Sequence, residues 1–478
     1  MKIMLLLLSL FHTIDPSSLS KNLAFYELYP DTEEGQVALS RAAHLLSCQN
    51  RETVARFNLL LNRKEAESLT DSELYLIEKM ASGLPNRRLK GYQARSESEV
   101  LLLPSEEIDL GSALVLSQYG EQEGAFLQAR RYSALLDLMA LQILAQLPKQ
   151  ASYEEKIRKM NHFIFDEMHF RFPPHSIYAQ DIDLYTFLPS VMDNHLGVCL
   201  GVTAMYIALA QRLDLPLEIV TPPGHIYVRC CTQERIINIE TTARGIDVPS
   251  EQYLGMNTRK LQLREVKEVV GMIHVNQAST YLHRGEYEKA LKTYQKAYPY
   301  LPEDALLNEL LGYSYLLVGE EKRGREHLEK IKDVLPEEAV IKRALAEDFL
   351  AGKTDLRGIR ALFERVDENR ESIIKKKETL EEIVACFPEF RDGLQMLATC
   401  WIQLQRYKEA IQVLEKHHLI DAHDPEVEYY LGALYAERYD FKNSWKHLKI
   451  AETIVKERGF SPKALRALRR ELLQHCPE

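Results

Sequence analysis

Two short stretches decide how the centre of this chain folds. Residues 196–201 are LGVCLG, and residues 222–229 are PPGHIYVR. The first stretch places Cys199 at the start of an apolar helix, and the second places His225 at the start of a strand. A thiol nucleophile and its general base are commonly delivered to one site in this way. The spacing therefore predicts that Cys199 and His225 form a pair.

Strand-like runs surround the histidine. These runs are rich in Ile and Val and are separated by Pro-Gly or polar turns, and they cover residues 217–220, 226–230 and 235–240. We expect the last run to bring Asn238 or Glu240 beside His225. The two residues are alternatives because they face the same side of the strand. Either would orient the imidazole and stabilise its cationic form. We therefore expect a triad of Cys199, His225 and Glu240, with Asn238 as the alternative third member.

The residues around Cys199 favour thiol chemistry. Gly197 lies just before the cysteine, and an apolar run follows it. A helix that begins there has partial positive charge and free N–H groups at its first turn, which favour a thiolate and stabilise an oxyanion. The sequence contains no HExxH, no GxxxxGK[ST] and no dinucleotide-binding motif. We therefore expect acyl chemistry without a metal or an organic cofactor.

The N-terminal part is expected to be helical. From about residue 20 to residue 149, apolar residues recur mostly at helical spacing. Lys2, the apolar run 3–11 and the polar stretch ending at Ser20 could form a cleaved export signal. A short buried helix would have the same pattern. We expect a cytoplasmic protein in the second case and an exported or periplasmic protein in the first.

A 34-residue period covers residues 265–460. Copies begin at residues 271, 305, 339, 391 and 425, with small residues at position 8 and position 20 and an aromatic residue at position 11. In the second copy these positions hold Gly312, Gly324 and Tyr315. This pattern is typical of tetratricopeptide repeats (TPRs), in which small residues let paired helices approach closely and aromatic residues fill the space between pairs. The sequence predicts a TPR solenoid, interrupted between about residues 366 and 388 and capped by a helix in residues 461–478.

Composition excludes several classes of protein. The net charge is −10, and Lys and Arg residues are interspersed with acidic residues, so no basic surface for nucleic acid is expected. The seven cysteines show no CxxC spacing, which argues against a zinc site of that kind and against a disulfide framework. No segment beyond the first twenty residues is apolar enough over sufficient length to span a membrane.

The central part of the chain resembles the transglutaminase-like superfamily, which has a papain-like core. The likeness is carried by residues 187–191 (FLPSV), 197–201 (GVCLG), 206–213 (YIALAQRL) and 223–225 (PGH), and it is greatest to the SirB-type subgroup. Residues 108–114 (IDLGSAL) are similar to the helical region that precedes the core in that subgroup. The resemblance implies that Cys199 is the nucleophile and His225 the base. Glu240 stands where the superfamily usually has Asp.

These observations predict a multidomain protein of α and α+β class. It would have a helical domain at 21–150, a transglutaminase-like core at 151–260 and TPRs at 265–460. The expected function is thiol acyl transfer of the peptidase, deamidase or transglutaminase type, with a protein or peptide bound on the concave face of the repeats. The rival interpretation is a catalytically inactive scaffold protein in which only the repeats function.

Overall fold

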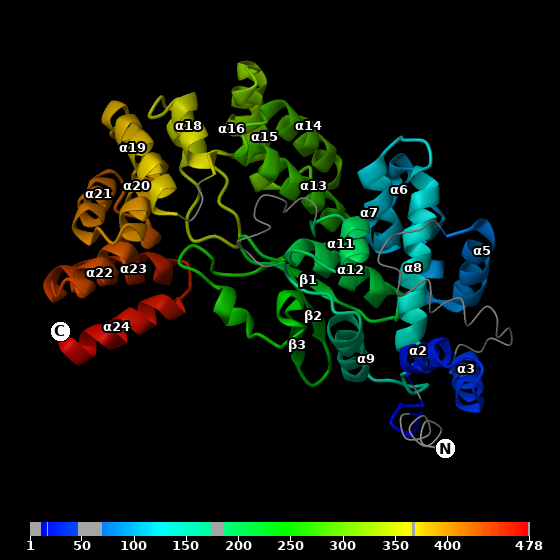
Figure 1. Ribbon diagram of the computed structural model, residues 1–478. Coiled ribbons are helices and arrows are strands. Elements are labelled where there is room, and N and C mark those ends of the chain that lie inside the picture. Colours follow the sequence, from blue (N-terminus) through cyan, green and yellow to red (C-terminus); the bar gives the residue numbers. More distant parts are fainter. Residues whose placement is uncertain (1–10, 17, 46–68, 174–184, 366–368, 477–478) are drawn as a thin grey trace. The chain divides into compact units, whose positions relative to one another are not determined.

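The computed structural model describes residues 11–16, 18–45, 69–173, 185–365 and 369–476 (Figure 1). The chain divides into two compact units. The core unit comprises Met1–Val220, Ile226–Val248 and Arg264–Ile273, and the repeat unit comprises Thr221–His225, Pro249–Leu263 and His274–Glu478. Half of the possible leader, residues 1–10, lies outside the described residues, as does residue 17.

The N-terminal region of the core unit is helical, as its spacing of apolar residues predicted. Its α-helices are α2 (Leu19–Leu28), α3 (Glu33–Leu45), α5 (Asp71–Met80), α6 (Glu97–Leu102), α7 (Leu110–Tyr119) and α8 (Ala125–Ala145). Helices α2 and α3 pack together, and α8 packs against α5 and α7. Short 3-10 turns at residues 81–83, 85–88, 90–93 and 105–107 join these helices.

Further helices lead into the sheet. They are α9 (Tyr153–Asn161), a π-helical turn (His162–Glu167), α11 (Leu188–Asn194) and α12 (Cys199–Arg212). Helix α12 packs against both α7 and α8. The helices of the predicted N-terminal domain and of the predicted core therefore lie in one compact unit, and the boundary near residue 150 stays a prediction.

Among the residues that the structure describes, the strands form one small sheet of four strands. They are β1 (Glu218–Thr221), β2 (Tyr227–Cys231), β3 (Ile236–Ile239) and β4 (Gln262–Arg264), in the order β3-β2-β1-β4. The β1–β2 and β2–β3 pairs are antiparallel, and Val228 lies opposite both Ile219 and Ile239. The three predicted strands are confirmed within one or two residues. The pattern of the sequence did not predict β4, which is only three residues long.

The C-terminal part consists of paired helices (Figure 1). They are α13 (Val266–His283), α14 (Tyr287–Ala297), α15 (Ala305–Leu317), α16 (Glu321–Ile331), α17 (Leu345–Leu350), α18 (Leu356–Phe363), α20 (Arg391–Gln403), α21 (Tyr407–Ile420), α22 (Pro425–Glu437) and α23 (Phe441–Glu457). A single helix, α19 (Arg370–Cys386), occupies the predicted interruption, and α24 (Lys463–His475) follows the last pair. The predicted TPR solenoid and the terminal helix are both present.

The small residues of the repeat hold the two helices of a pair close together. A Cβ on Gly324 would lie 2.9 Å from the carbonyl oxygen of Gly312 and 2.5 Å from Cγ of Leu316. In the last pair, the hydroxyl of Ser444 donates to the carbonyl oxygen of Gly432 at 2.7 Å. Small side chains at these positions therefore permit the contact on which each pair depends.

The third repeat has a shortened first helix, because α17 begins only at Leu345. Residues before it are held instead by the segment 249–263, which we call the strap. Oδ1 of Asn257 accepts hydrogen bonds from the backbone N–H groups of Val340 (3.0 Å) and Ile341 (2.8 Å). The backbone N–H of Arg259 donates to the carbonyl oxygen of Glu338 at 2.9 Å. These bonds satisfy backbone groups in the segment that precedes α17.

The strap also contributes to the apolar core of the repeat unit. Met256 is 8% exposed and belongs to a cluster with Val340 and with residues of α22, α23 and α24, among them Trp445, Leu448, Leu468 and Leu472. The strap is thus part of the solenoid's own packing. Among the described residues, no helix has the length and apolar composition needed to cross a membrane.

Candidate functional site

Cys199 is the first residue of α12, as the sequence predicted, and it is half-buried with a free thiol. The glycines beside it allow the helix to start close to α11. A Cβ on Gly197 would lie 3.2 Å from Val191 side-chain carbons, and one on Gly201 would lie 2.8 Å from Val191 Cγ2 and 2.5 Å from the carbonyl oxygen of Tyr185. The glycines are therefore required by packing at the point where Cys199 enters the helix.

Thr203 lies one turn after Cys199, on the same face of α12. Its hydroxyl is 2.8 Å from the hydroxyl of Thr241 and 3.5 Å from the carbonyl oxygen of Ile226. Ile226 follows His225 directly, and Thr241 follows Glu240 directly. Three chain segments that each carry a predicted site residue therefore approach the same buried threonine.

Glu240 is 5% exposed and follows the last residue of β3. Its Oε1 accepts hydrogen bonds from the backbone N–H of Thr242 (3.1 Å) and from the hydroxyl of Thr242 (2.6 Å). The carboxylate thereby caps the 3-10 turn Thr241–Ala243. This cap fixes the direction of the Glu240 side chain.

Asn238 is buried in β3, and its contacts hold a returning loop. Its side-chain amide nitrogen donates to the carbonyl oxygen of Val248 at 2.8 Å, and its backbone N–H donates to Oδ1 of Asp247 at 3.1 Å. Asn238 lies opposite Arg229 of β2. The amide group therefore has a structural role in fixing residues 247–248, which any catalytic role would have to share.

His225 lies in the turn that precedes β2. Gly224 has φ +70°, a conformation that side chains rarely adopt, and the backbone N–H of His225 donates to the carbonyl oxygen of Pro222 at 3.0 Å. The imidazole stacks on the ring of Tyr253, with centroids 5.6 Å apart and planes at 22°. The turn and the strap tyrosine together restrict where the imidazole can point.

Sequence reasoning did not identify Thr203 or Tyr253. The spacing between Cys199 and Thr203 is a detectable signal, because residues four apart share one helix face. Tyr253 gives no local signal, since it reaches His225 from a separate segment, at the end of the short 3-10 helix Ser250–Tyr253.

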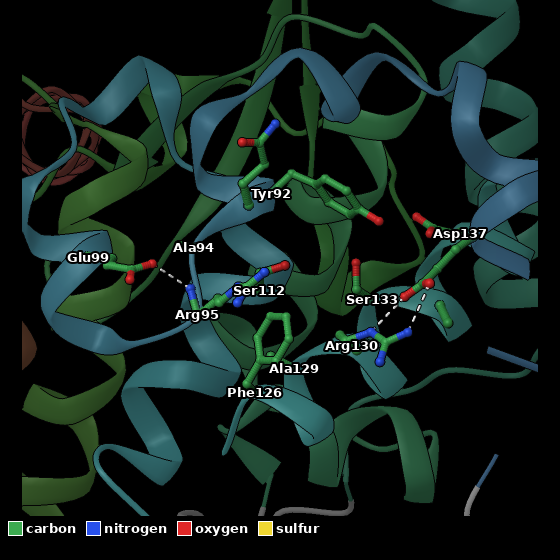
Figure 2. A pocket seen from close by; sticks show the side chains of 13 residues that line it. Tyr92, Ala94, Arg95, Glu99, Ser112, Phe126, Ala129, Arg130, Ser133 and Asp137 are labelled. Atoms are coloured by element: carbon green, nitrogen blue, oxygen red, sulfur yellow. Dashed lines mark hydrogen bonds and ion pairs between the residues drawn. The ribbon is translucent and has the colours of Figure 1, made fainter. Parts of the chain in front are cut away.

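A separate cavity of about 650 Å³ lies among the N-terminal helices, and Figure 2 shows its lining. The guanidinium of Arg130 forms two hydrogen bonds to the carboxylate of Glu78, at 2.9 and 3.0 Å. The carboxylate of Asp137 is paired with Arg87 and Arg212. Glu78 and Asp137 of the lining are therefore both ion-paired, and the lining includes none of the four predicted site residues.

Comparison with known protein families supports the fold of the core. Residues 130–266 match the model of the transglutaminase-like superfamily. This match includes Cys199, His225, Asn238 and Glu240, and the chain therefore contains a transglutaminase-like domain. The SirB-type subgroup stays a prediction. No curated protein sequence matches the chain.

Solved structures of the protein MamA are similar to part of the chain. MamA AMB-1 is 17% identical with a TM-score of 0.21, covering 40% of this chain and 93% of that one. MamA from Desulfovibrio magneticus RS-1 is 16% identical with a TM-score of 0.21, covering 39% and 96%. A similarity this low carries no functional argument, and the TPR assignment rests on the helix pairs of the chain itself.

Proposed function

Because residues 130–266 form a transglutaminase-like domain, we propose that this protein is a thiol acyl-transfer enzyme that needs no cofactor. Cys199 is the nucleophile, His225 the general base and Glu240 the residue that orients the imidazole. The repeat unit binds the protein or peptide that is acted on, through its concave face. Because the protein has a net charge of −10, we do not expect its ligand to be a nucleic acid.

The observation that carries the proposal is the position of Thr203. Its hydroxyl contacts the residues directly after His225 and directly after Glu240, and it lies one turn from Cys199. Thr203, Ile226 and Thr241 are all buried, which favours one fixed arrangement of the three segments. This supports a common site for the three side chains, because His225 and Glu240 each directly precede a residue of this contact and Cys199 lies one helical turn from it.

The chemistry follows from these roles. The thiol proton of Cys199 passes to His225 as the sulfur attacks the carbonyl carbon of an amide. The C–N bond then breaks, the leaving amine takes the proton from His225, and a thioester remains on Cys199. Water or a second amine, deprotonated by His225, attacks the thioester and releases the thiol. Water yields hydrolysis or deamidation, and an amine yields a new amide.

Glu240 is the stronger choice for the third residue. The side-chain amide of Asn238 donates to the carbonyl oxygen of Val248 and so is already used to hold residues 247–248. A carboxylate also stabilises an imidazolium more than an amide does. We expect Glu240→Gln to lower Cys199 reactivity more than Asn238→Ala does, when both variants are compared at equal fold content.

The first test is the alkylation rate of Cys199 as a function of pH, measured by mass spectrometry on the full chain. An ordinary thiol ionises near pH ~8.5. Rapid labelling of Cys199 at pH 6, lost in His225→Ala and kept in a variant of the exposed His423, supports an ion-paired nucleophile. The exposed Cys386 and Cys476 serve as internal controls. Labelling of Cys199 at the rate of these controls would contradict the proposal.

A second candidate function is that of an inactive scaffold. It is favoured by the two hydrogen bonds that Glu240 already receives from Thr242, which make this carboxylate a structural cap. In that case the repeats perform the function and the core serves as a folded support. Two results together would favour this alternative. The Cys199→Ser variant would capture the same partners as the unchanged protein, and Cys199 of the unchanged protein would be labelled no faster than the exposed cysteines.

A further inference from the structure

Three potential metal ligands meet near the end of the repeat unit. They are His418 at the end of α21, Glu428 in the first turn of α22 and His447 in α23, and their ligand atoms all lie within 4.8 Å of one another. Nδ1 of His418 contacts Oε1 of Glu428, and Nδ1 of His447 lies 2.7 Å from Oε2 of the same carboxylate. One carboxylate is thus placed between two imidazoles that come from different helices.

The cluster is buried. The side chain of Glu428 is fully buried, that of His447 is 1% exposed and that of His418 is 15% exposed. A buried carboxylate is costly unless positive charge compensates it. In the parts of the chain that the structure describes, the ion-pair partners of Glu428 are these two histidines, and no Lys or Arg pairs with it. An ion bound by all three side chains would supply the missing positive charge.

An earlier pair of repeats shows that the solenoid does not need this carboxylate. The same positions of the repeat hold Gln295, Tyr298, Asn308 and His327, where the last pair has Glu415, His418, Glu428 and His447. Nδ1 of His327 lies 3.2 Å from Oδ1 of Asn308, and its ring stacks on Tyr315 as that of His447 does on Tyr435. The geometry is shared, but the earlier site keeps just one of the three potential ligands, His327, and has Tyr298 and Asn308 in place of the other two.

A carboxylate lies near the second ring nitrogen of His447. This nitrogen, Nε2, is 3.3 Å from Oε1 of Glu415 but forms no hydrogen bond among the described residues, and the hydroxyl of Tyr435 donates to the same oxygen at 2.8 Å. Metal-ligating histidines commonly direct the other ring nitrogen at a carboxylate, which fixes the tautomer and leaves the ligating nitrogen unprotonated. In the earlier pair, Gln295 stands in place of this carboxylate.

We propose that His418, Glu428 and His447 bind a divalent transition metal ion of the zinc class. Two imidazole nitrogens and one carboxylate oxygen form a donor set that suits zinc, and water fills the fourth tetrahedral position. Metal bonds of about 2.0–2.2 Å hold ligand atoms further apart than hydrogen bonds do, so the carboxylate moves slightly away from both imidazoles on binding. The ion joins α21, α22 and α23.

The test compares the full chain with a variant that copies the earlier repeats. Glu428→Asn with His418→Tyr introduces the residues that the same fold already carries at Asn308 and Tyr298. Each protein is stripped with a chelator, loaded with Zn²⁺ alone and dialysed, and bound zinc is counted by elemental analysis. Affinity is measured against a chromophoric chelator. Both proteins carry a Cys199→Ser background, which removes a competing thiolate.

We expect one more zinc ion per chain in the parent than in the double variant, and at least a 100-fold loss of affinity in that variant. His418→Gln, a change at the partly exposed ligand, should lose affinity while folding normally. His327→Gln at the earlier site is the matched control and should keep full zinc binding. Equal zinc content in the parent and in both His418 variants would overturn the proposal, because the cluster would then be only a hydrogen-bonded group.

Discussion

A fully buried arginine joins three helices of the core unit. Arg212 of α12 donates to Oδ1 of Asp137 and to the hydroxyl of Ser133, both at 2.8 Å, and lies 3.6 Å from Asp109. Burial alone would raise the pKa of Asp109, but Arg212 and the hydrogen bonds from Asn86 and Ser112 hold it below its usual value. The arginine therefore keeps a buried carboxylate ionised.

Removing this charge should destabilise the core unit. Arg212→Met leaves Asp109 and Asp137 buried without their main partner, and we expect a loss of about 3–5 kcal/mol in the free energy of unfolding. Chemical denaturation measures it. Arg88→Met is the control, because Arg88 and its partner Asp214 are both 74% exposed, and such a pair contributes about 0–1 kcal/mol. Equal losses in the two variants would contradict this account.

A second buried ionisable side chain, that of Asp392, lies in the repeat unit. Burial, together with Asp348 and Glu309, raises the pKa of Asp392 to about 7, against the opposing effect of Arg391 and Arg343. Its Oδ2 is buried and has no hydrogen-bond partner among the described residues. The folded state therefore holds a proton that the unfolded chain loses near pH ~4.

The raised pKa of Asp392 makes the free energy of unfolding fall as pH rises. Stability from the protonated Asp392 is fully present below the unfolded pKa and is lost as pH rises towards about 7. Asp392→Asn, which cannot ionise, should raise the free energy of unfolding by about 1–3 kcal/mol at pH 8 and by much less at pH 5. Denaturant titrations at both pH values test it, with the exposed Asp333→Asn as control. A gain at pH 5 as large as at pH 8 would exclude ionisation as the cause.

At the scale of elements, helix pairs depend on the close approach of small residues. Alanine favours a helix over glycine by about 1 kcal/mol, but a Cβ on Gly324 would lie 2.9 Å from the carbonyl oxygen of Gly312. We expect the clash to exceed the gain, so that Gly324→Ala lowers stability by about 1–3 kcal/mol. Thermal unfolding followed by circular dichroism measures this.

The matched control is Gly83→Ala in the core unit, where a Cβ would meet nothing within 4 Å. This change should be close to neutral. If Gly324→Ala were as mild as Gly83→Ala, the contact between α15 and α16 would tolerate more separation than its geometry indicates.

Most elements were predictable from local patterns. The strands around His225 and the paired helices follow from apolar periodicity and turn residues, which act over a few residues. The shortened α17 was not predictable, because the backbone N–H groups of the segment before it donate to Oδ1 of Asn257 in the distant strap. Helix α19 fills an interruption where the repeat pattern gave no prediction.

At the scale of the whole molecule, the strap contacts parts of the solenoid that are far apart in the sequence. Met256 packs with Val340 and with residues of α22, α23 and α24. The guanidinium of Arg458 donates at 3.2 Å to the carbonyl oxygen of Ala339, the residue directly before Val340. A segment that precedes the repeats in sequence is therefore built into the packing of the last pair.

Shortening this side chain should loosen the end of the solenoid. Met256→Ala removes a side chain that is 8% exposed, and we expect a loss of about 2–5 kcal/mol. Hydrogen exchange should show faster opening of α23 and α24. Leu263→Ala in the same segment is the control, because Leu263 is 50% exposed. Unchanged exchange in α23 and α24 would show that the strap does not support them.

The sequence alone determined the helical N-terminal part, the strands β1, β2 and β3, the register of the repeats and the location of Cys199 at the start of a helix. Each depends on interactions among residues near one another in the chain, so a periodic pattern is sufficient. Only the tertiary structure decided that Thr203 meets the residues after His225 and Glu240, that Tyr253 stacks on His225, and that Glu428 lies between His418 and His447. Those contacts join distant segments through packing, for which a single sequence has no local signal.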